Sequence, residues 1–585
     1  MQILTHVVGI PDSDTKVHVY SGTCAALTCI VGDDDAGEGL TSMVSFVVEA
    51  GTTYTIAFDN YFSSAAFSFI LSMFYVPPPP EGVMVFTNTT IVGAGGIMGA
   101  VDMNNDGRDD AVMPGQTSFN IGYQYDLGAY AIANYPTTAA VNTASWSFAI
   151  GDWDSNGRRD LLYGGGSGAT FMKADATGTN YTQVTFPQYI FCQRTNFADL
   201  NNDGHLDAFS CHDVDANVAF LNDGNGNLVF TQGGYGTTCG NYGSIFTDLN
   251  NDGSMDLFVA KCGCDANDLM MPNNGTGTFT NVAPAQGLAD GHQSWSSAWA
   301  DFDNDGDMDA FIGSSGGGVH KLLVNDGAGN FTNVTAGSGM DSFAGSSIEW
   351  TAHDFNNDGW VDILGGGAMH YNNGDMTFGH DVTAPNNHAI GDMNNDGFLD
   401  VLNGNGYFAN GGNDNKWIRI NLVGVASNRD AIGARVIITS TLGTQIREIR
   451  SGDGFRYMSL IGAHFGLGED TEVEQVEVRW PSGAVEIFQD VAINTTHTYV
   501  EGVSIGIAEL AGDAFTVAPN PVADVLVVSG IPANAQVEVI DAAGKRVMTE
   551  RLLGSDLDVG KLAPGIYQLR VIDGTRSRVA RFAKH

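Results

Sequence analysis

The chain has 585 residues, more than one hydrophobic core can organise, so several domains are expected. Hydrophobic residues make up 43% of the sequence, which excludes wholesale disorder. Its 67 acidic and 25 basic side chains give a formal net charge of −42, which excludes nucleic acid and anionic membranes as partners, since binding phosphates needs clustered positive charge.

Residues 1–75 contain short apolar runs such as VHVY, VSFVV and YTIAF, which predict a strand-rich module. The N-terminus reads as the middle of a strand rather than as a signal peptide, so we expect further sequence upstream. The run Pro77–Pro80 makes residues 76–82 a stiff linker. Because no stretch of 18 apolar residues occurs anywhere, we expect no membrane span.

Residues 83–412 repeat one pattern seven times: Asp-x-(Asp/Asn)-x-(Asp/Asn)-Gly-x-x-Asp. The copies begin 38 to 53 residues apart, which indicates one supersecondary unit per repeat. They start at Asp102, Asp152, Asp199, Asp248, Asp301, Asp354 and Asp392.

Oxygen-bearing side chains recur at the first, third, fifth and ninth places of each copy, and calcium takes six to eight oxygen ligands. The backbone carbonyl at the seventh place would add a ligand, and the glycine at the sixth permits a sharp turn. The pattern therefore predicts up to seven Ca²⁺ ions. The predicted side-chain ligands are Asp102, Asn104, Asp106, Asp110, Asp152, Asp154, Asn156, Asp160, Asp199, Asn201, Asp203, Asp207, Asp248, Asn250, Asp252, Asp256, Asp301, Asp303, Asp305, Asp309, Asp354, Asn356, Asp358, Asp362, Asp392, Asn394, Asp396 and Asp400.

The alternative for these copies is a set of ordinary hairpin turns, but seven copies with fixed carboxylates favour calcium. We expect the second copy to bind most weakly, because Asn156 replaces an aspartate and Arg158 and Arg159 add positive charge. Unlike an EF-hand, no copy has Glu at the twelfth place, and strand-like residues follow each one.

A second hairpin, such as FLNDGNGNLVFT or LLVNDGAGNFTNV, follows the calcium turn in several repeats. Each repeat is then about four short strands, the size of a propeller blade. The sequence therefore predicts an all-β protein, in which a seven-bladed calcium-binding β-propeller is flanked by small β-sandwich-like modules.

With these motifs, residues 83–412 resemble the FG-GAP/VCBS repeat family, whose calcium-bearing blades also occur in integrin α-chain propellers. The resemblance implies the propeller fold, the metal and an adhesion-type role. It does not supply a ligand, and the chain has no RGD tripeptide.

Residues 413–502 carry SNRDAIGARV, HFGLGED and VEVRWPSG, and resemble the ASPIC/UnbV domain of cartilage-acidic-protein-like chains. Asn428, Arg429, Asp430 and the turn Trp480–Gly483 could bind a ligand, but we favour a structural role. Residues 17–75 resemble a pre-peptidase-like β-sandwich, although more weakly. We therefore expect residues 1–75 to form such a sandwich, truncated at its N-terminal side.

Residues 503–513 read as a linker, and residues 514–585 resemble the type A sorting domain of type IX secretion through VAPNPVADVLVV, VEVIDAAGKRV and LDVGKLAPGIYQLRV. This resemblance implies a bacterium of the Bacteroidota type. It also implies contact with the type IX machinery, and a protein that is secreted or held on the outer cell surface.

The seven cysteines come in close sets, which favours disulfides in an oxidising compartment over zinc. Cys192 and Cys211 flank the third calcium turn and Cys239 and Cys262 the fourth, so two disulfides are expected there. Either Cys262 or Cys264 could be the partner of Cys239. The alternative to these disulfides is that the cysteines are buried free thiols. Cys24 could pair with Cys29.

No GxSxG, P-loop, HExxH or Rossmann motif occurs, so no catalytic residue is predicted. A transition metal could be bound by His212, His320 and His370, but we favour the interpretation that each is a loop histidine or a histidine between blades. The tryptophans could stack on sugars, but packing is favoured for Trp295, Trp299, Trp350 and Trp360. We expect a binding or adhesion scaffold for an extracellular protein or glycan; the alternative is a propeller enzyme, a lyase or hydrolase, acting on extracellular polysaccharide.

Overall fold

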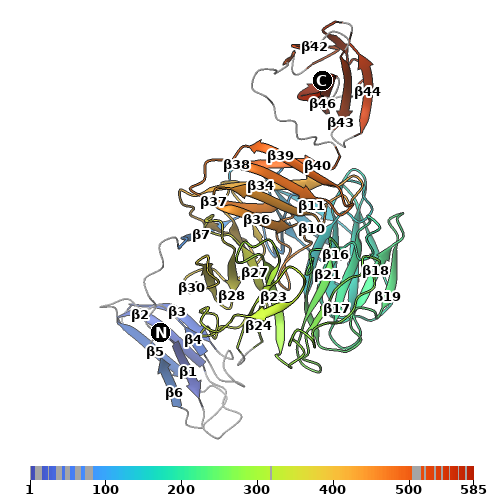
Figure 1. Ribbon diagram of the computed structural model, residues 1–585. Helices are drawn as coiled ribbons and strands as arrows, with labels where there is room; N and C mark the ends of the chain where they lie inside the picture. Colours follow the sequence, from blue (N-terminus) through green and yellow to red (C-terminus); the bar gives the residue numbers. More distant parts are fainter. Residues whose placement is uncertain are drawn as a thin grey trace. The chain divides into compact units, whose positions relative to one another are not determined.

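The computed structural model describes residues 2–6, 16–23, 26–33, 43–45, 53–59, 68–72, 83–315, 319–502, 516–518, 522–531, 535–541, 545–552, 554–563, 565–573 and 576–584. These residues form strands, turns and loops, with no helix among them (Figure 1). The all-β expectation is thus confirmed for the described part of the chain. The chain divides into two compact units, Met1–Glu81 and Gly82–His585. The predicted linkers 76–82 and 503–513 lie outside the described residues.

The first unit contains two three-stranded antiparallel sheets in its described part, with strand orders β4-β1-β6 and β3-β2-β5. Val44 of the first sheet packs with Val17 and Val19 of the second. The strands are β1 (Gln2–His6), β2 (Lys16–Thr23), β3 (Ala26–Asp33), β4 (Met43–Ser45), β5 (Tyr54–Asp59) and β6 (Ser68–Ser72).

The repeat region, residues 83–412, forms seven small antiparallel sheets from its described residues, and six of them have four strands. The first three sheets are β8 (Gly99–Val101), β9 (Asp110–Met113), β10 (Ser118–Asp126) and β11 (Ala129–Pro136); β12 (Ser147–Gly151), β13 (Asp160–Gly165), β14 (Gly168–Ala174) and β15 (Tyr181–Thr185); and β16 (Cys192–Ala198), β17 (Asp207–His212), β18 (Val218–Asn222) and β19 (Leu228–Gln232).

The fourth sheet has three strands in the described residues, and the last sheet takes one strand from the start of the region. The four remaining sheets are β20 (Asn241–Thr247), β21 (Asp256–Lys261) and β22 (Leu269–Met271); β23 (Ser294–Ala300), β24 (Asp309–Ser314), β25 (Lys321–Asn325) and β26 (Phe331–Asn333); β27 (Trp350–His353), β28 (Asp362–Gly365), β29 (Ala368–Asn372) and β30 (Phe378–Asp381); and β31 (Ile390–Gly391), β32 (Asp400–Asn403), β33 (Gly406–Asn410) and β7 (Phe86–Thr90).

In six of the seven sheets the strands follow chain order, and in most sheets the last strand is less buried than the inner strands. In the second sheet every residue of β12 and β13 is buried, whereas β15 alternates between half-buried and exposed positions. Apolar runs such as FAIG and DLLYGG therefore become inner strands that are covered on both faces. In the last sheet β7 pairs with β33, from Phe86 opposite Asn410 to Thr90 opposite Gly406, so the two ends of the repeat region share one sheet.

Residues 413–502, here called the module, form two further sheets from their described residues, β37-β34-β40 and β36-β35-β38-β39. Strand β34 pairs in parallel with β40, and the other pairs are antiparallel. The strands are β34 (Lys416–Val423), β35 (Arg435–Ser440), β36 (Gly443–Glu448), β37 (Ala463–Gly468), β38 (Val473–Arg479), β39 (Val485–Val491) and β40 (Thr496–Val500).

The segment between β36 and β37 leaves the module and lies among the first strands of the repeat sheets. Its Met458 exchanges backbone hydrogen bonds with Met98 and Ala100, and its Arg456 carbonyl accepts one from Phe148. Glu349, next to β27, accepts hydrogen bonds from the N–H groups of Phe455 and Arg456, both at 2.7 Å. One hydrophobic cluster also combines module residues with the first three repeat sheets. The module and the repeat region therefore share a core.

Residues 516–584 form two sheets of their own from the described residues, β41-β42-β45 and β44-β43-β46-β47, around a separate apolar cluster. The strands are β41 (Thr516–Ala518), β42 (Val525–Ser529), β43 (Gln536–Asp541), β44 (Arg546–Arg551), β45 (Asp556–Asp558), β46 (Gly565–Asp573) and β47 (Arg576–Lys584).

The cysteines correct the sequence prediction. Cys239 pairs with Cys264, not Cys262, which is a free thiol donating to Gln293. The predicted bond between Cys192 and Cys211 is wrong, since both thiols are free and buried.

The register explains why Cys192 and Cys211 do not pair. Cys192 lies opposite His212, so Cys211 is one residue out of step and belongs to the apolar cluster on the other face of the sheet. Of the pair proposed in the first unit, Cys29 is free and Cys24 lies outside the described residues.

A buried ion pair joins the module to the first repeat. Both amino groups of Arg419 donate to the Asp109 carboxylate, at 2.7 and 2.6 Å, and their side chains are 3% and 0% exposed. Removing one partner of such a pair leaves an uncompensated buried charge. We therefore predict that Arg419→Met lowers the free energy of unfolding by about 3–5 kcal/mol, measured by urea denaturation.

The matched control is Arg479→Met, which breaks a 2.7 Å bond to Glu477 made by a side chain that is 53% exposed. That change should cost less than about 1 kcal/mol. Equal losses for the two variants would contradict the buried contact between the module and the repeat region.

Candidate metal centres

The seven motif copies occupy the same place in the seven repeat sheets. Each first-place aspartate directly follows the first strand of its sheet, as Asp102 follows β8, and each ninth-place aspartate is the first residue of the second strand, as Asp110 is of β9. The motif is therefore the loop joining two buried inner strands, as the sequence predicts.

Two residues of each loop have a left-handed backbone. The fourth-place residue has φ between 55° and 61°, and the sixth-place glycine has φ between 85° and 99°. Asparagine tolerates this conformation better than most residues, which explains why it fills the fourth place in six copies and Ser155 in the other. These two positions turn the chain so that the N–H groups of the fifth and sixth places point toward the side chains of the first and third places.

These N–H groups bind the motif carboxylates in the same pattern in every copy. One oxygen of the first-place aspartate accepts from the fifth-place N–H at 3.0–3.2 Å, and the other accepts from the glycine N–H at 2.6–3.0 Å. The third-place side chain also accepts from the fifth-place N–H, at 3.0–3.3 Å. The seven loops are therefore geometrically equivalent.

The ninth-place aspartate closes each loop. It accepts hydrogen bonds from the second-place N–H at 2.8–3.1 Å and from an N–H at the end of the third strand at 2.6–3.0 Å. All seven of these carboxylates are 0% exposed. Because neutral N–H donors supply only part of the hydration that a carboxylate loses, each is an electrostatic liability unless a cation approaches.

The pKa values show the size of this liability. Burial raises the pKa of Asp110, Asp256 and Asp309 to about 8, and that of Asp207 to about 7, despite the backbone hydrogen bonds that oppose the shift. Burial also raises the pKa of the first-place Asp301 to about 7, with the charges of Asp305 and Asp303 adding to it. Each loop therefore concentrates negative charge that is costly to keep ionised.

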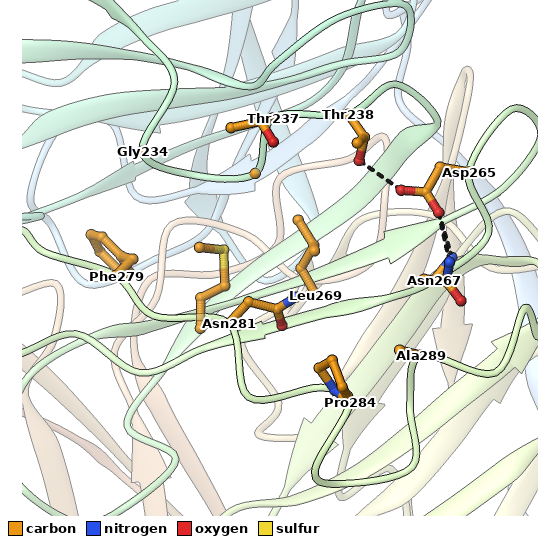
Figure 2. A pocket seen from close by; sticks show the side chains of 12 residues that line it. Gly234, Thr237, Thr238, Asp265, Asn267, Leu269, Phe279, Asn281, Pro284 and Ala289 are labelled. Atoms are coloured by element: carbon orange, nitrogen blue, oxygen red, sulfur yellow. Dashed lines mark hydrogen bonds between the residues drawn. The ribbon is translucent and has the colours of Figure 1, made fainter.

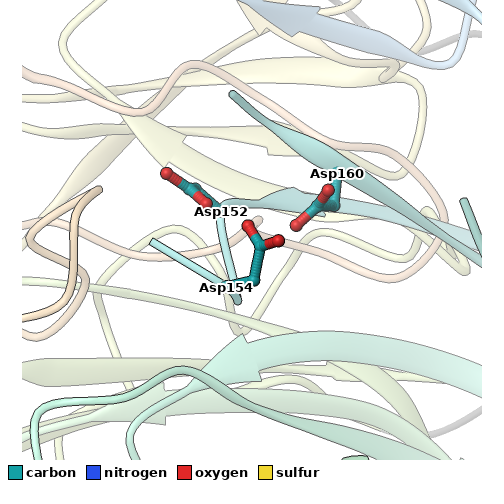
Figure 3. A group of neighbouring side chains, drawn as sticks. All are labelled: Asp152, Asp154 and Asp160. Atoms are coloured by element: carbon teal, nitrogen blue, oxygen red, sulfur yellow. The ribbon is translucent and has the colours of Figure 1, made fainter. Parts of the chain in front are cut away.

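Two loops bring three carboxylates together. Oxygens of Asp152, Asp154 and Asp160 lie within 4.8 Å of one another, and those of Asp301, Asp303 and Asp309 do the same. Figure 3 shows the first group, with the three side chains directed toward one another. The other five copies have asparagine at the third place, which supplies an amide oxygen instead of a carboxylate. An all-oxygen set of this kind fits a hard cation such as Ca²⁺.

The fifth-place side chain forms a hydrogen bond within its own loop. Asp305 is not part of the group formed by Asp301, Asp303 and Asp309, and its Oδ1 accepts a hydrogen bond from the N–H of Asp307. The same bond recurs in the other copies. The fifth place thus fixes the loop in this structure, and its role as a ligand stays a prediction.

The second loop is less unfavourable for a cation than its arginines suggest. Arg159 is bound by Asp430 of the module at 3.0 Å, and the Asp430 carboxylate also accepts the N–H of Asp152 at 2.7 Å. The positive charge of Arg159 is therefore offset by a residue 271 positions away, whereas that of Arg158 is not part of this contact. This contact also gives Asp430 the structural role that was favoured for it.

The sequence reading missed a set of asparagines that connects neighbouring loops. The side-chain amide of Asn222 donates to the second-place carbonyl of the preceding copy, Trp153, at 2.6 Å. The same contact is made by Asn273, Asn325, Asn372 and Asn410. In the first sheet the Tyr130 hydroxyl donates to Met393, linking the first copy to the last. The signal that could have indicated these contacts is the asparagine that opens the second hairpin in most repeats, as in FLNDGNGNLVFT.

The candidate histidines and two of the four candidate tryptophans take part in packing. Trp299 and Trp350 are 1% and 0% exposed, inside apolar clusters. His320 and His370 both contact Trp350, whereas His212 packs on Tyr189. Among the described residues, neither three-membered group of metal-ligating side chains contains a histidine.

Three segments of the chain match protein-family models. Residues 152–210, 199–259 and 248–312 match the FG-GAP-like repeat, residues 424–505 match the model described as ASPIC and UnbV, and residues 516–585 match the secretion system C-terminal sorting domain. The expected resemblances to FG-GAP repeats, to the ASPIC/UnbV domain and to the type IX sorting domain are therefore confirmed, whereas that of residues 17–75 to a pre-peptidase-like module stays a prediction. The sorting domain indicates secretion to the cell surface and implies contact with the type IX secretion machinery. The described residues form no helix suited to crossing a membrane.

Human cartilage acidic protein 1 is 27% identical over 210 residues, which cover 34% of this chain and 27% of the human protein. A solved Agrocybe aegerita lectin that recognises non-reducing terminal N-acetylglucosamine is 16% identical, with a TM-score of 0.36 over 65% of this chain and 92% of the lectin. PorZ, a surface component of the type IX secretion system of Porphyromonas gingivalis, is 13% identical, with a TM-score of 0.26 over 95% of this chain and 64% of PorZ. At these TM-scores neither likeness bears on function.

The carboxylate at the ninth place gives a direct test of metal binding. In chelator, Asp309→Asn should be at least as stable as the wild type, because it removes a buried carboxylate whose pKa is about 8. In millimolar calcium the variant should melt below the wild type, because it has lost a ligand charge that the ion stabilises. The measurement is the melting temperature of both proteins in EDTA and in calcium.

The control is Asp326→Asn, which changes an exposed turn aspartate of the same sheet and should behave alike in both buffers. If Asp309→Asn shifted the melting temperature equally with and without calcium, the carboxylate would have a structural role only.

Proposed function

We propose that residues 83–412 form a seven-bladed β-propeller that binds up to seven calcium ions, and that the chain is a surface-exposed scaffold for an extracellular protein or glycan. The observation that carries this proposal is the sevenfold recurrence of one loop, with the same carboxylates and the same hydrogen bonds, at the same place in seven sheets.

The arrangement of the sheets supports the propeller. The first strand of one sheet contacts the first strand of the next through most of the series, as in β12 with β16, β16 with β20 and β20 with β23, and β31 contacts β8. The pairing of β7 with β33 holds the first and last blades together. Radial repetition of this kind leaves only short sheet edges.

The loop chemistry supports calcium. The side chains at the first, third and ninth places supply oxygens around one point, the fifth place lies beside them, and the seventh-place carbonyl completes the proposed set. Calcium accepts such a flexible oxygen shell, whereas Mg²⁺ requires near-octahedral geometry and keeps several of its waters. Seven divalent ions would offset about a third of the formal net charge of −42.

The secretion of the chain to the cell surface supports the proposed role as a scaffold. The sorting domain brings the chain to the cell surface, where calcium reaches the millimolar level at which extracellular modules bind it. Each bound ion would fix the connection between two inner strands, and the asparagine contacts would transmit that order to the next blade. The result is a rigid platform whose outer loops can hold a ligand.

Calcium removal tests this function. We predict that EDTA lowers the melting temperature of the full chain by more than 10 °C, because the ions bind only the folded state (on the order of several kcal/mol in total). Excess calcium should restore the transition, and equal magnesium should restore much less of it. An unchanged melting temperature in EDTA would overturn the calcium propeller.

A further inference from the structure

The fourth repeat sheet, β20 to β22, differs from the other six. After β22 the chain makes only an isolated bridge between Asn273 and Phe279 in place of a fourth strand. A cavity of about 540 Å³ opens beside β22, between the loop before β20 and residues 279–289. Figure 2 shows the side chains that line it, drawn from both of these segments and from β22. Its volume is in the range of ligand sites in proteins.

The cavity has an apolar floor and a polar rim. Leu269, Met271 and Phe279 form the floor and are 7%, 5% and 8% exposed. The rim carries the hydroxyl of Thr237 and the amide of Asn267, both on exposed residues. An apolar surface with hydroxyl and amide groups around it matches a ligand that has one C–H face and a margin of hydroxyls.

The rim is held in place before any ligand arrives. Cys239, in the loop before β20, is bonded to Cys264 in the loop between β21 and β22. Beside this disulfide, Asp265 accepts hydrogen bonds from the Thr238 hydroxyl at 2.6 Å and from the N–H of Asn267 at 3.1 Å. Such preorganisation lowers the entropic cost of binding.

The cavity is close to electrically neutral. Asp265, its charged lining residue, forms an ion pair at 2.9 Å with Lys261, whose side chain is 0% exposed. Although partial burial opposes it, hydrogen bonds from Thr238 and Lys261 hold the pKa of Asp265 at about 2, so this carboxylate stays ionised beside the lysine. With a formal net charge of −42 on the chain, anionic ligands would be repelled, which favours a neutral ligand.

The strand order places this cavity away from the motif loops. The loop before β20 and the loop between β21 and β22 lie at one end of the antiparallel sheet, and the fourth motif loop, between β20 and β21, lies at the other. The module contacts the motif end, since Glu448 accepts from the N–H of Asp248 at 3.2 Å. The lining includes no module residue, so the module leaves the cavity open.

We propose that this cavity is a carbohydrate site, in which a neutral saccharide unit packs its C–H face on Leu269, Met271 and Phe279 and hydrogen-bonds to the rim. This inference rests on the proposed scaffold function, whose ligand it narrows to a neutral glycan. A peptide is the competing occupant, and the experiment separates the two.

The test uses the full chain in millimolar calcium on an array that holds neutral and anionic glycans and a set of random peptides. Thr237→Trp places an indole over the rim from an exposed position. The matched control is Thr278→Trp, an exposed threonine of the same sheet that is not part of the lining. We expect binding to neutral glycans, a loss of at least tenfold in affinity for Thr237→Trp, and no change for Thr278→Trp, with the strongest neutral saccharide titrated by calorimetry.

The possible failures are distinguishable. Binding only to anionic glycans or only to peptides would overturn the inference. The inference would also fail if the protein bound none of the probes while its melting temperature still depended on calcium. Neutral glycan binding unaffected by Thr237→Trp would move the site elsewhere and leave the scaffold function standing. If the wild type showed no calcium-dependent melting transition, the proposed calcium-binding propeller itself would be contradicted.

Discussion

The burial of the ninth-place carboxylate in every motif loop, joined in six loops by that of the first-place carboxylate, is the constraint on which the repeat region depends. The ninth-place aspartates are inaccessible to water, and backbone N–H groups replace only part of the lost hydration. A divalent cation would resolve this conflict, and the loop is already folded around the place where the ion would bind. Because each loop joins the first and second strands of a sheet, the ion would hold the two most buried strands in register. The proposed metal sites are therefore part of the core.

The contacts between loops extend this constraint across the molecule. Asparagines such as Asn325 connect five of the repeats to the preceding loop, and the Tyr130 hydroxyl does the same between the first and last copies. The module then contacts the motif end through Arg419, Asp430 and Glu448, while the segment between β36 and β37 lies against the first strands. The proposed calcium binding would consequently be linked to sheet order and module docking, and the proposed ligand site lies at the opposite loop end.

The sequence predicted what is local and repeated. The spacing of the aspartates predicts a strand, a loop and a strand, and Asp110 and its counterparts do begin the second strands. It could not predict contacts between distant residues, such as Arg159 with Asp430, because their proximity depends on how whole sheets pack. The cysteine errors have a simpler origin. Cys192 and Cys211 flank one turn as predicted, but a bulge and the alternation of side chains place them on opposite faces of the sheet.

The most direct test of the calcium propeller is the metal content of the purified chain. The protein would be dialysed to equilibrium against buffer containing millimolar calcium, and bound calcium would be measured by inductively coupled plasma mass spectrometry as the excess in the protein compartment over the buffer compartment. Our account predicts a content approaching seven calcium ions per chain, because seven equivalent loops are present. A folded protein that retains no calcium, and that shows no calcium uptake when titrated by calorimetry, would contradict the account.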